Sequence, residues 1–175
     1  YFDSSLFEIV RGALPDVPTK PAPQGTCALM QKLGVTVESG EVLYVGDSNV
    51  DVATAHNAGL PCCGVSTLAA MAYGVGDFNG LIVGAMDARR QQVYNALFKA
   101  ENGRIIRLCD DRAVSCEYVA QELRDAYPSE NDILIVGDGA ELLYKHLQAF
   151  GIPCRMADEH HRMQSAVGVA LCAEE

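Results

Sequence analysis

Residues 41–64, EVLYVGDSNVDVATAHNAGLPCCG, limit most strongly the folds that are open to this chain. The apolar run VLYV predicts a short buried strand, Gly46 permits a sharp turn, and Asp47 or Ser48 can cap the helix that follows. Gly59 predicts the end of this helix, before a second apolar run. A strand, a helix and a returning apolar run are typical of a parallel βαβ unit, so the sequence predicts an α/β fold.

Acidic side chains gather at the predicted junction of strand and helix. Asp51 lies one helical turn beyond Asp47, beside the positive end of the helix. Oxygen ligands in this position suit a magnesium ion and a phosphorylated substrate. Lys20 stands on a loop stiffened by Pro21 and Pro23 and can offset phosphate or carboxylate charge. The stretch by itself is equally typical of a capped helix with one surface aspartate.

Two motifs, TKPAP at 19–23 and VGDSNVDVATAHNAG at 45–59, resemble the third and fourth motifs of the haloacid dehalogenase superfamily of phosphatases. With YFDSSLFEIVRGALPDV they resemble its phosphoglycolate phosphatase branch, over residues 1–66. The resemblance implies that Lys20 steadies a phosphoryl group, that Asp47 ligates magnesium, and that Asp51 supports the metal site.

The same resemblance implies a nucleophile that this sequence does not contain. These phosphatases attack phosphorus with the first aspartate of a DxD motif that follows their first strand, and no apolar strand followed by DxD occurs in the sequence. Covalent phosphoryl transfer needs a nucleophile within reach of the phosphorus. We therefore expect no phosphatase turnover from this chain alone, and weak binding of magnesium by Asp47 and Asp51.

From residue 66 onward the sequence changes character. The string STLAAMAYGVGDFNGLIVGAMDARRQQVYNALFK, at 66–99, resembles the second half of the TsaB family, the actin-like subunits of bacterial tRNA threonylcarbamoyladenosine biosynthesis. The runs at 81–86 and 93–98 predict a hairpin whose polar turn holds Asp87, Arg89 and Arg90, and such a turn is more often solvated than catalytic. The resemblance implies a ribonuclease H-like domain.

The rest of the chain fits that domain. We expect a third antiparallel strand at 104–109, followed by a helix at 115–127. Ser115 caps this helix, and Val119, Leu123 and Ala126 face inward. After it we expect a strand at 132–136, a helix at 140–150, a short strand at 152–156 and a closing helix at 160–172. The sequence GDG at 137–139 predicts a turn with a helix cap, and a phosphate-binding loop is the alternative.

Charge and hydropathy exclude two classes of partner. The net charge is −10 and acidic residues outnumber basic ones in both halves, so we expect no direct binding to nucleic acid. No stretch reaches the ~20 apolar residues that span a membrane, and no signal sequence is recognised at the N-terminus, so we expect no membrane contact and a cytoplasmic location.

The sequence therefore predicts a half-Rossmannoid βαβ segment at 1–66 and a TsaB-like, ribonuclease H-like domain at 67–175. The leading hypothesis is a non-catalytic TsaB-like component of threonylcarbamoyladenosine biosynthesis, with a TsaD-like protein as its partner. A phosphatase-like segment replaces the half to which the resemblance assigns pairing with TsaD, so we expect an incomplete function and self-association. The alternatives are a haloacid dehalogenase-type, magnesium-dependent phosphatase that lacks its nucleophile, and a binding module without turnover.

Overall fold

The chain divides into two compact units, unit 1 at Tyr1–Gly64 and unit 2 at Val65–Glu175. The structure is a computed structural model that describes residues 8–12 and 15–174. The division falls close to residue 66, where the resemblance in the sequence changes from one family to the other. Each unit is described by itself below.

Unit 1 contains one parallel βαβ unit, as the sequence predicts. Strands β1 and β2 pair in parallel, with Tyr44 opposite Cys62 and Gly46 opposite Gly64, and helix α2 connects them. The elements of unit 1 are α1 (Gln24–Leu33), the 3-10 helix η2 (Val37–Ser39), β1 (Tyr44–Gly46), α2 (Asn49–Asn57) and β2 (Cys62–Gly64). The strand begins two residues later than predicted, and Gly59 follows the helix with a positive φ of 72°.

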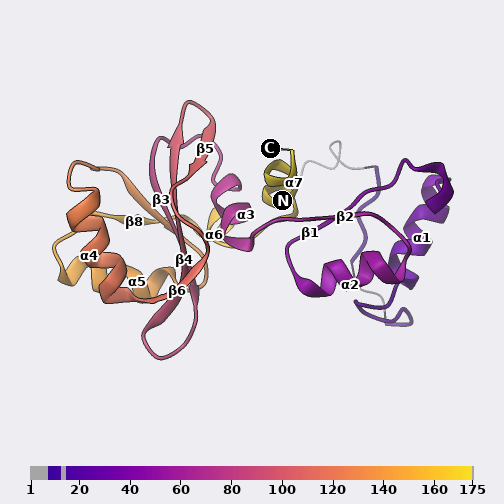
Figure 1. Cartoon of the computed structure of the whole chain (residues 1–175), viewed down its shortest axis with the longest axis horizontal. Helices are drawn as coiled ribbons and strands as arrows, with labels where there is room; N and C mark the ends of the chain where they lie inside the picture. Colours follow the sequence, from indigo (N-terminus) through magenta and orange to yellow (C-terminus); the bar gives the residue numbers. More distant parts are fainter. Residues whose placement is uncertain (1–7, 13–14, 175) are drawn as a thin grey trace. The chain divides into compact units, whose positions relative to one another are not determined.

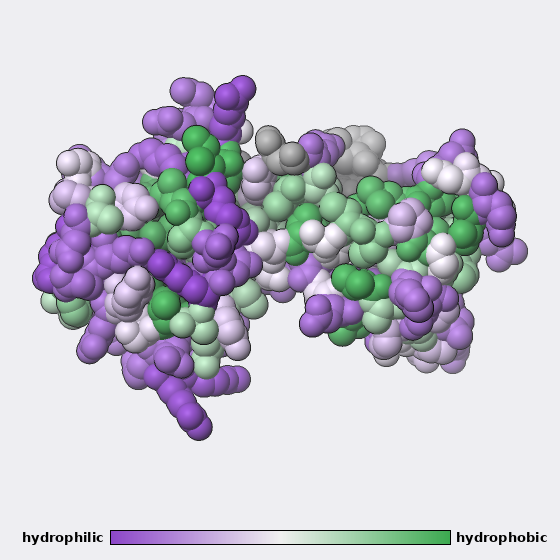
Figure 2. Space-filling model, in the orientation of Figure 1, coloured by the Kyte–Doolittle hydropathy of each residue, from purple (hydrophilic) through white to green (hydrophobic). Residues whose placement is uncertain are grey.

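The hydrophobic core of unit 1 is small. Its cluster contains three buried residues, Met30, Ala55 and Leu60, with partly buried side chains packed around them. Several large apolar side chains of the unit stay exposed instead, among them Leu43, which is 58% exposed, and Val52. Figure 2 shows such apolar side chains, in green, on the visible face of the unit. Unit 1 therefore leaves much of its apolar surface in contact with water.

Unit 2 is built around a six-stranded mixed sheet (Figure 1). The strand order is β5-β4-β3-β7-β8, and β6 also pairs with β4. Strands β3 and β4 form the predicted antiparallel hairpin, while β7 lies parallel to β3 on its other side. The strands are β3 (Gly80–Asp87), β4 (Gln92–Glu101), β5 (Arg104–Arg107), β6 (Arg112–Ser115), β7 (Ile133–Val136) and β8 (Arg155–Met156).

Helices cover both faces of this sheet. They are α3 (Thr67–Tyr73), α4 (Cys116–Ala126), α5 (Ala140–Ala149), α6 (Glu159–Arg162) and α7 (Ala166–Ala173). Side chains of β3 alternate between the two faces, because successive residues of a strand point in opposite directions. Leu81 and Val83 join one core cluster with residues of α4 and α5, and Ile82 joins a second cluster with residues of α3. Figure 1 shows α4 and α5 on one side of the sheet and α3 on the other. The sequence predicts three antiparallel strands before the alternating helices and strands, and the structure has β6 in addition.

Three sequence predictions for unit 2 were wrong in detail. The expected closing helix at 160–172 is two helices, because Met163 is extended and the Ser165 side chain accepts the amide of Gly168 to cap a new helix. Ala126 is exposed, although Val119 and Leu123 are buried as predicted. Strand β6 was missed, because its four residues carry no alternating apolar pattern and are placed by pairing with β4.

No helix within residues 8–12 and 15–174 is both long enough and apolar enough to cross a membrane.

Candidate functional site

The centre of the candidate site is an ion pair between Lys20 and Asp51 in unit 1. The Lys20 Nζ atom donates to Asp51 Oδ1 at 2.6 Å, although the two residues are 31 positions apart in the chain. The side chain of Lys20 is 58% exposed, whereas that of Asp51 is 9% exposed. The carboxylate is therefore fixed inside the unit, and the ammonium group that it orients still reaches solvent.

Helix α2 positions Asp51 through its first turn. Ser48 is the N-cap, and its hydroxyl accepts the amide of Asp51 while the Asp51 carboxylate accepts the amide of Ser48, which completes a capping box. The Ser48 hydroxyl also donates to Asp51 Oδ2 at 2.5 Å. Gly46, at the end of β1, makes room for this arrangement, because a Cβ atom there would lie 2.2 Å from Asp51 Cβ.

Tyr44 completes the cluster, and the sequence analysis missed it. Its hydroxyl donates to Asp51 Oδ1 at 3.4 Å, and Lys20 Nζ lies 5.7 Å from the centre of its ring. The spacing in the sequence could have indicated this role, since Tyr44 stands two residues before Gly46 and therefore lies on the same face of the strand. An aromatic ring beside an ammonium group stabilises the charged form.

The cluster keeps both partners of the ion pair charged. Burial opposes the charge of Lys20, but hydrogen bonds with Asp51 and Tyr44 outweigh it and raise the pKa of the lysine above its usual value. Burial likewise opposes the charge of Asp51, and the hydrogen bonds from Lys20 and Ser48 outweigh it and lower the pKa of the aspartate. The arrangement therefore presents a fixed cation at the carboxyl end of β1.

The residues around this cation offer few ligands for magnesium. Within residues 8–12 and 15–174 no group of three or more histidine, cysteine, aspartate or glutamate side chains could hold a metal ion. Asp51 already accepts from Lys20, Tyr44 and Ser48, so its oxygens are engaged within the cluster. The two aspartates therefore do not form a ready-made pair of ligands, and weak binding of magnesium by Asp47 and Asp51 stays a prediction.

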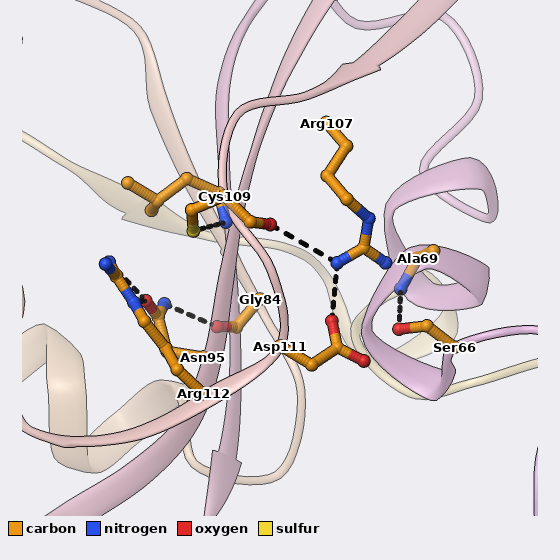
Figure 3. A network of polar contacts seen from close by, with 9 residues as sticks. Ser66, Ala69, Gly84, Asn95, Arg107, Cys109, Asp111 and Arg112 are labelled. Carbon is orange, nitrogen blue, oxygen red and sulfur yellow. Dashed lines mark hydrogen bonds and ion pairs between the residues drawn. The ribbon is translucent and has the colours of Figure 1, made fainter.

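Unit 2 holds a second polar cluster, whose groups satisfy one another (Figure 3). Asn95 is fully buried on β4; its Nδ2 atom donates to the carbonyl of Gly84 at 2.9 Å, and its Oδ1 atom accepts from Arg112 at 3.0 Å. Arg112 continues to Glu122 on α4, and its guanidinium lies over the Tyr118 ring. Each group has a partner, so this cluster joins β3, β4, β6 and α4 rather than awaiting a ligand.

The polar turn between β3 and β4 is solvated, as the sequence predicts. Arg89, Arg90 and Gln91 follow one another with positive φ angles of 67°, 52° and 62°. The Arg89 side chain is 86% exposed and lies 3.5 Å from Asp87. These side chains form no enclosed site with one another.

The GDG turn at 137–139 packs closely on β3. A Cβ atom at Gly137 would lie 2.1 Å from the carbonyl oxygen of Ala85, and one at Gly139 would lie 2.9 Å from the amide nitrogen of Asp87. Asp138 Oδ1 also accepts the Asp87 amide. The close approach of two backbone segments therefore explains both glycines, which favours a turn over a phosphate-binding loop.

Comparisons with known proteins describe the two units differently. Residues 3–65 match the family described as Haloacid dehalogenase-like hydrolase, which confirms the first resemblance over unit 1. No curated protein matches the chain significantly.

Solved structures resemble the chain in fold. YeaZ from Pseudomonas aeruginosa has a TM-score of 0.55 at 18% identity, over 87% of this chain and 73% of that chain. An uncharacterized protein with similarity to peptidase YEAZ, also from Pseudomonas aeruginosa, has a TM-score of 0.54 at 17% identity, over 83% of this chain and 70% of that one. YeaZ proteins are of the TsaB type, so these likenesses confirm the predicted actin-like fold. At such identities they show the fold alone.

Proposed function

We propose that this protein is a non-catalytic, TsaB-type component of tRNA threonylcarbamoyladenosine biosynthesis. The observation that carries the proposal is the sheet of unit 2, whose order β5-β4-β3-β7-β8 with β6 belongs to a fold similar to that of YeaZ. The polar cluster of unit 2 supports a structural role, because the side chains of Asn95, Arg112 and Glu122 bind one another.

The partner that this proposal requires is a TsaD-type catalytic subunit. Calorimetric titration of the whole chain with such a subunit tests it, with an intact TsaB-type protein measured alongside. We expect a one-to-one complex that is weaker than that of the intact protein, because unit 1 replaces part of the surface that the resemblance assigns to pairing. A folded chain that gives no heat at concentrations of about 100 μM, where the intact protein binds, would contradict the proposal.

A second candidate function rests on unit 1. The Lys20–Asp51 pair lies at the carboxyl end of β1, where it supports recognition of a phosphoryl group in a haloacid dehalogenase-type phosphatase. The residues of the sequence do not supply the nucleophile of that reaction, because no DxD motif occurs among them.

Hydrolysis of phosphoglycolate and of an aryl phosphate, measured with and without magnesium, distinguishes the two candidates. We expect no turnover above background from the purified chain, since its sequence contains no DxD motif to supply the nucleophile. A magnesium-dependent rate that disappears in Asp47→Asn, while the variant keeps its circular dichroism spectrum, would instead favour the phosphatase.

A further inference from the structure

The end of the hairpin between β3 and β4 carries a row of apolar side chains that stays partly exposed. Tyr94 lies opposite Met86 on β3 and opposite Ala113 on β6, so the three side chains share one face of the sheet. Tyr94 is 52% exposed, Ala113 is exposed, and Met86 is partly buried. Helix α3 covers the neighbouring row instead, where Leu68 would lie 3.1 Å from a Cβ atom at Gly84. Below, Met86, Tyr94 and Ala113 are called the apolar row.

Two adjacent arginines stand at the tip of the same hairpin. The side chain of Arg89 is 86% exposed and lies 3.5 Å from Asp87, a weak surface ion pair. Arg90 is exposed, and no ion pair engages it among the residues that the structure describes. The other nearby carboxylate, that of Asp138, accepts the amide of Asp87. Exposed charges more than about 8 Å apart are screened at physiological salt, so these local charges decide what binds at the tip.

The backbone of the tip is held in an unusual conformation. Residues 89–91 all have positive φ angles, which side chains with a Cβ atom seldom adopt. Hydrogen bonds at both ends of the turn hold this conformation: Asp87 Oδ1 accepts the amide of Arg89 at 2.7 Å, and the carbonyl of Gln91 accepts the amide of Cys116 at 3.2 Å. A turn that is already fixed loses less conformational freedom on binding, which lowers the cost of association.

The arginines and the apolar row together suit an acidic polypeptide. An arginine fork pairs with a carboxylate through two parallel hydrogen bonds, and tyrosine and arginine are residues at which binding energy often concentrates. A nucleic acid is disfavoured, because its affinity comes from many phosphate contacts, whereas the tip offers two arginines with two carboxylates beside them. A symmetric pair of copies is also disfavoured, because a two-fold interface would bring the same arginines of both copies together.

We propose that the end of the β3–β4 hairpin is a docking surface for a partner protein, which binds it with an acidic segment that also carries a large apolar side chain. Carboxylates of the segment pair with Arg89 and Arg90, and the apolar side chain covers Tyr94 in the apolar row. The resemblance assigns pairing with TsaD to the half that unit 1 replaces, so this surface of unit 2 is an additional one. The inference does not depend on either function proposed above.

A panel of fluorescent synthetic peptides tests the proposal on the whole chain. Each peptide joins two glutamates to two leucines through a glycine–serine spacer of about one to four residues, and binding is followed by fluorescence anisotropy. We expect at least one peptide to bind with a Kd below about 1 mM, and its glutamine counterpart to bind at least about tenfold more weakly. In the isotope-labelled chain, the bound peptide should shift the amide resonances of residues 86–94 and of Ala113.

Variants of the chain separate the local charges from the net charge. The double variant Arg89→Glu/Arg90→Glu should lose the glutamate peptide and bind a lysine counterpart in its place. Tyr94→Ser should weaken both peptides by a similar factor, because it removes an apolar contact and no charge. The matched control is Arg104→Glu, at an exposed position of β5. It should change the affinity by less than about twofold, because its charge is screened from the tip. Circular dichroism verifies that each variant is folded.

Four results would overturn the proposal. A panel in which no peptide binds below about 1 mM, or in which glutamine peptides bind equally well, would show that the arginines do not recognise carboxylates. An equal loss of affinity in Arg104→Glu would assign binding to the net charge of the chain. A single-stranded RNA that binds more tightly than every peptide at about 0.15 M salt and shifts the same amides would make a nucleic acid the occupant. A dimer that sedimentation detects and that Tyr94→Ser dissociates would make it a second copy.

Discussion

Asp51 combines three roles in one side chain. It completes the capping box of α2, it accepts from the Tyr44 hydroxyl, and it holds the ammonium group of Lys20. The first role stabilises the nine-residue helix α2, and the last one fixes a cation whose side chain stays 58% exposed. Replacing the carboxylate therefore affects both the stability of unit 1 and its charge at the end of β1.

The ion pair should give unit 1 a stability that depends on pH. The pKa of Asp51 is lowered in the folded chain, so its contribution is present above the unfolded value of about 3.9 and is lost as the pH falls through the folded value. The pKa of Lys20 is raised, so its contribution is present below about 10.4 and is lost as the pH rises through the folded value.

We expect Asp51→Asn to lower the free energy of unfolding of unit 1 by about 1–2 kcal/mol at pH 7, mostly through the cap. Lys20→Met should cost less than about 1 kcal/mol, because the lysine is largely exposed. Urea unfolding from pH 3 to 8 measures both. If the loss in free energy of unfolding of each variant stays constant down to pH 3, the Lys20–Asp51 ion pair does not account for the pH dependence.

At the scale of elements, α3 and α7 pack closely together at Gly168. A Cβ atom at Gly168 would lie 2.2 Å from the carbonyl oxygen of Ala70 and 3.2 Å from the amide nitrogen of Gly74. Helix axes approach to 8–10 Å, depending on the side chains at the contact, so small residues permit the closest pairs. Gly168 is therefore a packing residue of α7, although glycine lowers the intrinsic stability of a helix.

Gly168→Ala should accordingly destabilise unit 2 although alanine is the better helix former. We expect a loss of about 1–3 kcal/mol, because the backbone atoms of α3 cannot move aside as a flexible side chain does. Ala170→Ser, at an exposed position of the same helix, is the matched control and should change the stability by less than about 0.5 kcal/mol. A stabilised Gly168→Ala variant would mean that α7 does not lie against α3.

At the scale of the whole molecule, the two units differ in how much they bury. Among the residues that the structure describes, unit 1 has one cluster of three buried residues, whereas unit 2 has two large clusters on opposite faces of its sheet. Hydrophobic burial is the dominant favourable contribution to folding, so the units should differ in stability. Small units that bury little are marginal without a partner.

We therefore expect two unfolding transitions, with unit 1 melting at the lower temperature. Differential scanning calorimetry of the whole chain detects them, and Asp51→Asn assigns the first transition because it shifts that transition alone. A single transition that Asp51→Asn and Gly168→Ala both shift would show that the units unfold as one.

The sequence by itself determined the elements whose signals are local. The order of strand, Gly46, capped helix and Gly59 predicted β1 and α2, since a turn and a cap depend on residues a few positions apart. Periodicity predicted β3, β4 and α4 for the same reason. The motif around Lys20 also placed this residue and Asp51 in one site, which the structure joins at 2.6 Å.

Only the tertiary structure decided the features that depend on distant parts of the chain. Strand β6 exists because β4 offers it a partner, and the glycines at 137 and 139 are required because β3 lies against them. The role of Tyr44 beside Lys20 follows from which segments meet in space. Local preferences cannot supply these facts, because pairing and close packing are set by residues far apart in the sequence.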